Sequence, residues 1–393
     1  MKLQVSEKHI KLRIAIVAVA FVVAVAAFTV GVVSIGKKTP GFQTIEAKVD
    51  ADTILANKTV VFKYWLDGST NEIKRGIRAL EEAYTPILLN IYKELDHQKT
   101  YTGVVNLASL NQNQGQELTV SAQLYEVLRD AYRRTLEKKD FNMFAGALYG
   151  EWQSILILDD PFYFDPLITR SQADRINEIV KAVSDLNNFK LEFLDDAKHT
   201  VRFSVSDYYR QLCYDYEIEA PALDLNVLKD AYMIRCMASS LAAAGYTEGY
   251  LATSEGLVLN MRKSSSLGYE LHTLEKGNDT VYGKLDVQGA FSGSTFTAFG
   301  MGTPYHYVLR AGYSEGKTET DLYRNRYFNV RTGGFSDILM SLTVINPDLD
   351  VVDTACLALQ LNNLTSEADV KKLAASLETK NIIVSYVFQS VVK

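Results

Sequence analysis

The sequence is poor in the residues that most metal and disulfide sites need. Its 393 residues include only 3 cysteines and 5 histidines. Cys213, Cys236 and Cys356 are odd in number and scattered, so they neither form a disulfide framework nor show metal-ligand spacing. They are expected to be buried thiols. The histidines show no H-E-x-x-H or comparable pairing, so a histidine zinc enzyme is not indicated.

Common catalytic and nucleotide-binding motifs are also missing. The chain has no G-x-S-x-G elbow, no G-x-x-x-x-G-K-[ST] loop and no strand-turn-helix G-x-G-x-x-G. It lacks basic clusters as well, with 41 Lys and Arg against 47 Asp and Glu and a net charge of −6. Nucleic acid is therefore not expected as a partner, and the basic residues near the N-terminus are too few for specific lipid recognition.

The chain does contain one long apolar run, Ile14–Ile35, which carries no charge. As a helix this run spans about 33 Å, which is roughly one hydrocarbon core. More basic residues precede it than follow it closely, so the N-terminus is placed in the cytoplasm. We therefore expect a single-pass protein of the cell membrane, with cytoplasmic residues 1–13, a transmembrane anchor at 14–35 and an extracytoplasmic remainder. A signal peptide cleaved after Ala24-Val25-Ala26 is the alternative, although the apolar run continues past these residues.

The remainder is expected to form one domain at 59–393 after a juxtamembrane segment at 36–58, because no Pro/Gly/Ser-rich or highly charged linker divides it. Ser69 and Glu72 have the spacing of a capping box, and apolar residues then recur every three to four positions to about Leu95, which predicts an amphipathic helix. Further helices are predicted at 225–244, 351–361 and 366–377, and strands at 59–66, 189–193, 200–205, 250–261, 269–274, 280–287, 341–345 and 382–388. This mixture predicts an α/β (α+β) sandwich of mixed sheets and helices.

Several segments across residues 59–388 resemble the ApbE family, the exported FAD:protein FMN transferases. Leu223–Tyr232 aligns without a gap on the family's "L-D-L-G-G-I-A-K-G-Y" and is the most specific match. The other matches are Thr100-Tyr101 with Leu110-Asn111 on "S-T-Y … L-N", Phe141–Leu148 with Trp152 on "F-D-x-T-V-G-P-L" and the tryptophan after it, Arg331-Thr332-Gly333 on the end of "H-I-I-D-P-R-T-G", and Val352–Leu359 on "A-D-A-L-A-T-A-L". The resemblance implies an ApbE/T-fold-like sandwich.

The resemblance also implies a chemistry and assigns residues to it. Members of the family transfer FMN from FAD to a threonine of a partner flavoprotein, with Mg²⁺ on the pyrophosphate. By this resemblance the FAD-binding residues are Tyr101, Asp224, Asp230 and the backbone of Asp140, Phe141 and Asn142. Asp353 would be both the metal ligand and the catalytic residue. The expected cofactors are FAD and Mg²⁺, and the expected partner is an exported or membrane flavoprotein acceptor.

Substitutions at family positions leave alternatives open. Asn226 and Val227 stand in place of two glycines, and Leu357 stands in place of a metal-binding threonine. The chain is therefore either an FAD:protein FMN transferase with reduced or lost activity or a non-catalytic ApbE-like binding or scaffold module. Asp353 is alternatively a first-turn acid of the helix that starts at Val351, where the helix dipole stabilises it. A third hypothesis is self-flavinylation, because Ser292–Thr295 resembles the acceptor motif "S-G-A-T".

Overall fold

The computed structural model describes residues 38–389 except for 52, 138–139, 157–165, 167–168, 255, 265, 276–277, 298–307, 312–319, 324–326, 335–337 and 348–349. The predicted anchor at Ile14–Ile35 and the alternative cleavage site lie outside the described residues. Within the described ranges, no helix is both long enough and apolar enough to cross a membrane.

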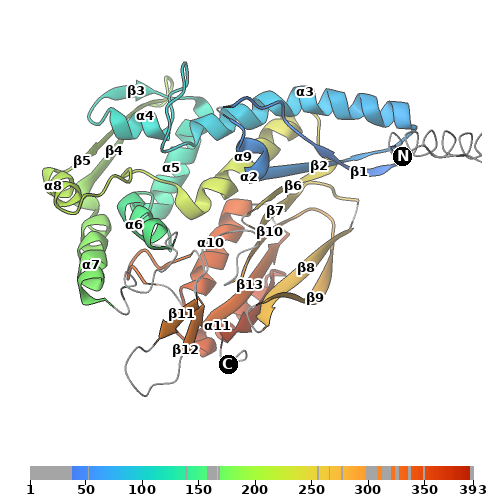
Figure 1. The fold of residues 1–393 in the computed structure, drawn as a ribbon. Helices are drawn as coiled ribbons and strands as arrows, with labels where there is room; N and C mark the ends of the chain where they lie inside the picture. Colours follow the sequence, from blue (N-terminus) through green and yellow to red (C-terminus); the bar gives the residue numbers. More distant parts are fainter. Residues whose placement is uncertain are drawn as a thin grey trace, which may run out of the picture.

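The first lobe of the molecule is built on an antiparallel sheet of seven strands (Figure 1). In spatial order its strands are β1 (Gly41–Ile45), β2 (Val60–Leu66), β6 (Gly249–Thr253), β7 (Leu257–Asn260), β10 (Phe291–Thr297), β13 (Leu339–Asn346) and β14 (Ile383–Phe388). Every residue of β13 is buried. The burial of β13 is expected, because both of its faces are covered. The helix α10 (Val351–Asn362) contacts β13 and β10, and the hairpin of β8 (Ser266–Glu275) and β9 (Asn278–Gln288) also packs against β13.

Helices cover one face of the sheet. They are α2 (Ala56–Thr59), α3 (Thr70–Glu94), α9 (Lys229–Ala243), α10 and α11 (Glu367–Glu378). The predicted capping box at the start of α3 is confirmed: the side chain of Ser69 accepts from the backbone N–H of Glu72, and the Glu72 carboxylate accepts from the Ser69 N–H. The main core lies between these helices and the sheet, and a smaller core lies between the sheet and the β8–β9 hairpin.

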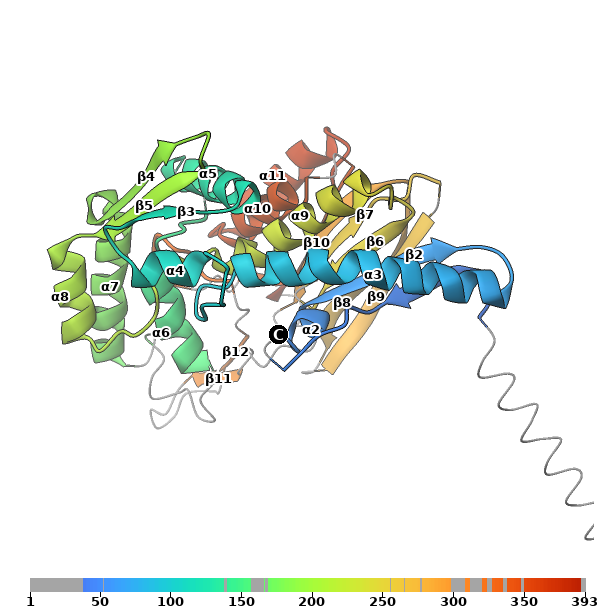
Figure 2. The ribbon, with the colours of Figure 1, turned by 90° about the horizontal axis from the view of Figure 1, so that it is seen from above.

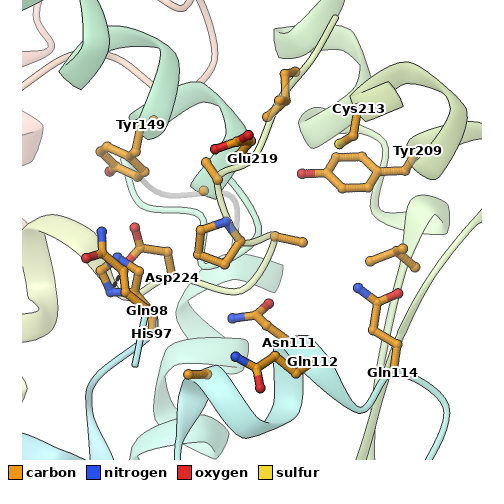
Figure 3. Close-up of a pocket in the computed structure, with 18 of the residues that line it drawn as sticks. His97, Gln98, Asn111, Gln112, Gln114, Tyr149, Tyr209, Cys213, Glu219 and Asp224 are labelled. Atoms are coloured by element: carbon orange, nitrogen blue, oxygen red, sulfur yellow. Dashed lines mark ion pairs between the residues drawn. The ribbon is translucent and has the colours of Figure 1, made fainter. Parts of the chain in front are cut away.

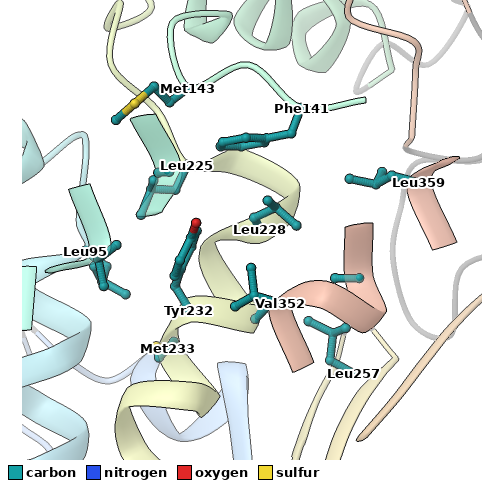
Figure 4. Close-up of a cluster of buried hydrophobic side chains, with 14 of the residues drawn as sticks. Leu95, Phe141, Met143, Leu225, Leu228, Tyr232, Met233, Leu257, Val352 and Leu359 are labelled. Carbon is teal, nitrogen blue, oxygen red and sulfur yellow. The ribbon is translucent and has the colours of Figure 1, made fainter. Parts of the chain in front are cut away.

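A second lobe is inserted between β2 and β6, and α3 runs from this lobe along the sheet (Figure 2). The lobe contains the sheet β3 (Glu117–Thr119), β5 (Thr200–Val205), β4 (Phe189–Asp195) and the helices α4 (Leu107–Gln112), α5 (Ala122–Leu136), α6 (Gly146–Leu156), α7 (Arg170–Ser184) and α8 (Asp207–Asp215). Phe144 stacks on Phe189 and Phe203, with ring centroids 4.8 and 5.9 Å apart. Apolar side chains from α3, α9, α10 and the loop before α6 join the two lobes (Figure 4).

The mixed α/β class is confirmed, while several elements differ from the sequence prediction. The segment expected as one strand at 250–261 is the hairpin β6–β7, because Gly256 turns the chain with a φ of +84°. β1 lies within the segment expected to be juxtamembrane, so the folded part begins before residue 59. The prediction also missed α6, α8, β10 and the short hairpin of β11 (Val308–Ala311) and β12 (Thr320–Tyr323).

Candidate functional site

A pocket of about 630 Å³ lies where the second lobe meets the segment that leads into α9 (Figure 3). Its walls come from the loop after α3, from α4, α6 and α8, and from residues 218–224. We call it the polar pocket, because amide, hydroxyl and carboxyl groups recur in its lining: His97, Gln98, Asn111, Gln112, Gln114, Tyr149, Gln153, Tyr209, Glu219 and Asp224. Such groups in a concave site offer both donors and acceptors to a small ligand.

Asp224 connects the polar pocket to the ApbE-like motifs. Its backbone N–H donates to the carbonyl of Met143 at 2.8 Å, and its Oδ1 accepts from the N–H of Asn226 at 2.8 Å. The second bond closes a local turn in which Asn226 has a φ of +39°. Asparagine is one of the few residues that tolerate this left-handed region, which explains how it occupies a position where the family has glycine.

Two of the matched segments meet at the floor of the polar pocket. The side-chain amide of Asn111 donates to the carbonyl of Leu223 at 2.8 Å, and its oxygen accepts from the N–H of the same residue at 2.9 Å. Gly146 packs against the residues just before Leu223, since a Cβ placed there would lie 1.8 Å from the carbonyl oxygen of Pro221. The backbone approach therefore explains the glycine without a cofactor.

Two buried polar atoms in the lining of the pocket lack a strong hydrogen-bond partner. One is the hydroxyl of Tyr209, a residue that is only 3% exposed and whose polar neighbour is the weakly hydrogen-bonding thiol of Cys213. The other is Nδ1 of His97, which makes no hydrogen bond and lies 3.3 Å from Oδ1 of Asp224. Buried polar groups are nearly always paired in folded proteins, so both atoms indicate a missing polar partner inside the pocket.

The protonation of the pocket follows from burial. Burial lowers the pKa of His97 below its ordinary 6.5, and Lys229 adds to this, while the charges of Asp224 and Asp96 oppose it. Burial also raises the pKa of Tyr209 well above 10. At neutral pH the imidazole is therefore neutral and the phenol keeps its proton, so each can donate or accept a hydrogen bond.

Tyr101 lies beside the pocket and not in its lining. Its hydroxyl donates to Asp96 at 2.8 Å, one residue before His97. The ammonium groups of Lys93 and Lys99 lie 5.6 and 5.3 Å from its ring centroid. Asp96 keeps a lowered pKa although burial raises it, because backbone N–H groups, Tyr101 and the charge of Lys229 stabilise the carboxylate. This side of the pocket is consequently rich in positive charge.

The segment of Asp140, Phe141 and Asn142 is held by the protein itself. The Asn142 side chain is buried; it donates to the carbonyl of Val183 at 2.8 Å and accepts from the Phe144 N–H at 2.9 Å. Phe141 is 2% exposed in the core. Asp140 accepts from Asn363 at 3.1 Å, at the end of α10. Only backbone groups of this segment remain available to a cofactor.

Asp353 lies in an ion-pair cluster outside the polar pocket. Nη1 of Arg134, from α5, lies 2.7 Å from Oδ1 of Asp353, and Nε of Arg134 lies 3.1 Å from Oδ2 of Asp130. Asp130 also accepts from Arg235 of α9 at 3.0 Å and from the hydroxyl of Tyr232 at 3.1 Å. We call Arg134, Asp130, Arg235 and Asp353 the Arg134 cluster. It ties α5 to α9 and α10.

The predicted site residues do not converge on one point. Asp140 contacts the end of α10, whereas Asp353 lies in its first turn, about 15 Å away along the helix axis. Asp230 lies in the first turn of α9 and is half-buried. Of the predicted residues, Asp224 alone lines the pocket. The structure thus separates Asp353, the residue expected to bind metal, from Asp224 and the polar pocket.

The Arg134 cluster does not fit a magnesium ion. Mg²⁺ needs several oxygen ligands at about 2.1 Å in octahedral geometry. Oδ1 of Asp353 already binds a guanidinium, and Leu357, one helical turn further, has no ligand atom. Among the residues that the structure describes, no group of three or more His, Cys, Asp or Glu side chains could hold a metal. No reaction step at Asp353 can be assigned to bound magnesium.

Sequence reasoning missed four residues that define these two regions: His97, Arg134, Tyr149 and Tyr209. Two signals were available. Gly146, Tyr149, Gly150 and Gln153 follow helical spacing, and all four line the pocket from one face of α6. Asp130 and Arg134 are four residues apart in the sequence, the spacing of an intrahelical ion pair, and both lie on α5. Nothing in the sequence indicated that Arg134 would reach Asp353.

The hypothesis of self-flavinylation places the acceptor hydroxyl on Thr295. This residue lies in β10 and is 5% exposed, and its hydroxyl is 2.8 Å from both Tyr269 and Thr343 hydroxyls. The motif thus lies in a buried strand, so the hydroxyl is inaccessible to a transferring enzyme.

Comparison with solved structures shows where this fold occurs. The chain is similar to an ApbE protein from Thermotoga maritima, with a TM-score of 0.57 and 12% identity over 90% of this chain and 95% of that one. It is also similar to the flavin transferase ApbE from Vibrio cholerae, with a TM-score of 0.51 and 14% identity over 84% of this chain and 90% of that one. A mutant of that protein gives a TM-score of 0.52 and 13% identity over 89% of this chain and 94% of that one. No family model and no curated protein matches the sequence. The chain has the fold of the ApbE flavin transferases at low sequence identity.

Proposed function

We propose that this ApbE-fold chain is a flavin-nucleotide-binding protein, held in the cell membrane by its N-terminal segment with the folded part outside. FAD is the ligand proposed for the polar pocket. The observation that carries this proposal is the pair of buried polar atoms without a strong hydrogen-bond partner, on Tyr209 and His97, in a pocket that is also lined by the motif residue Asp224.

The pocket has groups suited to the uncharged parts of FAD. A flavin or adenine ring presents both donors and acceptors at its edge, which matches neutral imidazole, phenol and amide groups. The carboxylates of Asp224 and Glu219 would repel the pyrophosphate, which is better placed on the side where Lys93, Lys99 and Lys229 lie. Lysine charge would then replace the metal that the family resemblance implies.

Titration of the full-length chain in detergent with FAD, followed by flavin fluorescence, tests this proposal. Gln112 is exposed at the rim of the polar pocket, so Gln112→Trp should block the entrance without unfolding the protein. We expect saturable binding by the wild type and at least a tenfold loss in Gln112→Trp, about 1.4 kcal/mol. Gln116→Trp, exposed outside the pocket on the same segment, is the matched control. Equal binding by the two variants would refute the proposed site.

A non-catalytic role in binding is favoured over FMN transfer by the ion pair between Arg134 and Asp353. The fold alone supports the second candidate, an FAD:protein FMN transferase that serves an exported or membrane flavoprotein acceptor. Incubation with FAD, Mg²⁺ and a threonine-bearing acceptor distinguishes them. The binding role predicts no AMP release and no covalent FMN on the acceptor, whereas either product would establish the transferase.

The proposed topology has its own test. Protease added to intact cells should digest the folded part of a full-length chain that is retained in the membrane fraction. Protection of the folded part would place it in the cytoplasm, and its release into the medium would support cleavage after Ala24-Val25-Ala26.

A further inference from the structure

We infer that the guanidinium of Arg134 takes the place of a divalent cation beside Asp353, so that the chain carries its own permanent counter-ion at this position and binds no Mg²⁺ there. The inference concerns the Arg134 cluster alone. It rests on the ApbE resemblance for the metal position, and its test requires neither FAD nor an acceptor.

The position of the guanidinium is fixed by the fold. The Arg134 side chain is 8% exposed and reaches from the last turns of α5 to the first turn of α10. Nη1 of its guanidinium lies 2.7 Å from Oδ1 of Asp353, while Nε lies 3.1 Å from Oδ2 of Asp130. A guanidinium presents its donors in a rigid fork, so two carboxylates on different helices hold it in one orientation.

The charges around Arg134 are already balanced by its neighbours. Asp130 is shared with Arg133 at 2.6 Å and with Arg235 at 3.0 Å, and Arg235 also lies 3.9 Å from Asp350. Asp350 caps α10 through the backbone N–H groups of Val352 and Asp353. Each buried charge therefore has an opposite charge next to it, and an added divalent cation would lie against a guanidinium that cannot lose its proton.

The groups beside Arg134 and Asp353 are not suited to act as further metal ligands. The thiol of Cys356 lies 3.5 Å from Nη1 of Arg134, and burial raises its pKa to about 11 although Arg134 opposes this. It is thus a neutral thiol at pH 7 and a poor ligand for a hard cation. Asp353 itself is 54% exposed, so any metal reaching it would meet one carboxylate and water.

Electron paramagnetic resonance of Mn²⁺ added to the full-length chain in detergent tests the inference, because bound and free Mn²⁺ differ in signal. The wild type should leave Mn²⁺ free. Arg134→Ala exposes the carboxylates of Asp130 and Asp353 to a common cavity, and we expect it to bind Mn²⁺ at least about tenfold more tightly than the wild type. Arg133→Ala is the matched control, since Arg133 pairs with Asp130 but not with Asp353. It should bind no better than the wild type.

Two results would overturn the inference. One is stoichiometric Mn²⁺ binding by the wild type that Asp353→Asn abolishes. The other is equal Mn²⁺ binding by Arg134→Ala and Arg133→Ala. If Arg134→Ala does not fold, Arg134→Met retains the length of the side chain without its charge and replaces it in the same titration, and the wild-type measurement stands by itself.

Discussion

The polar pocket and the Arg134 cluster both contain buried polar groups, but they differ in whether those groups have partners. In the pocket, Nδ1 of His97 makes no hydrogen bond, and the Tyr209 hydroxyl has only the weakly hydrogen-bonding thiol of Cys213 beside it. In the cluster, Arg134 and Asp130 are each bonded to charged groups on more than one side. Unsatisfied groups in a hollow indicate a ligand, whereas satisfied ones indicate a structural role. The same family resemblance had assigned cofactor chemistry to both regions.

The largest expected effect is on the stability of the Arg134 cluster. Asp130→Asn keeps the shape of the side chain but leaves Arg134 and Arg235 without their shared carboxylate. Removing one partner from a buried ion pair typically costs about 3 kcal/mol, and we expect a loss of this size in chemical denaturation. The control is Asp207→Asn, because Asp207 is 99% exposed in its pair with Arg210 and should cost less than about 1 kcal/mol. Similar losses of stability in both variants would show that the cluster does not stabilise the fold.

A smaller effect is expected where α6 meets the segment before α9 at the pocket wall. Gly146→Ala would place a Cβ 1.8 Å from the backbone oxygen of Pro221, which must move. Overpacking of this kind costs about 2 kcal/mol, and displacement of Pro221 should also weaken FAD binding.

The matched control for this substitution is Gly268→Ala, whose new Cβ would meet only the Asp286 carboxylate at 3.7 Å. Thermal denaturation and FAD titration of both variants measure the two effects. Normal stability and affinity in Gly146→Ala would show that the close approach of the two segments is unimportant.

Acid should weaken the Arg134 cluster. Burial raises the pKa of Asp130, but hydrogen bonds from Arg133 and Arg134 and the charge of Arg235 outweigh this and lower it to about 2 from the ordinary 3.8. Because the folded-state pKa is depressed, the stabilisation is complete above pH 3.8 and is lost as the pH falls toward 2. The free energy of unfolding of the wild type, measured at a series of pH values, should therefore fall more steeply over this window than that of Asp130→Asn. Parallel curves would contradict this assignment.

The smallest effect should separate ligand binding from stability. Tyr209→Phe removes a buried hydroxyl whose polar neighbour is only the thiol of Cys213, so the stability of the free protein should change by less than about 1 kcal/mol. FAD affinity should fall about fivefold if the hydroxyl bonds to the ligand, the size of one neutral hydrogen bond. Tyr84→Phe is the control, because Tyr84 also has a buried, unpartnered hydroxyl but lies in the core away from the pocket. A loss of affinity in both variants, or in neither, would remove Tyr209 from the proposed site.

The sequence predicted local elements better than it predicted the site. The Ser69 capping box and the helix after it depend on neighbouring residues, and both are found in the structure. The meeting of Asn111 with Leu223 and of Trp152 with the carbonyl of Gly333, at 2.6 Å, joins matched motifs that are far apart in the chain. The resemblance to the ApbE family could suggest these contacts, but the periodicity of apolar residues could not.

The role of Asp353 could not be derived from the sequence, because its partner comes from another helix more than two hundred residues away. A first-turn acid at this position fits a metal ligand, a helix-dipole acid or an ion-pair partner equally well. The contact with Arg134 favours the ion-pair partner. In the same way, a buried hydroxyl without a strong partner, such as that of Tyr209, is a property of packing and leaves no sequence signal.

The most direct test of the difference between the two regions is the dissociation constant of FAD measured by fluorescence, first with EDTA and then with excess Mg²⁺. We predict that the two values agree within about twofold, because the pocket holds the ligand and Arg134 keeps Mg²⁺ from Asp353. Binding that appears only with Mg²⁺, and that Asp353→Asn abolishes, would contradict this assignment of the two regions.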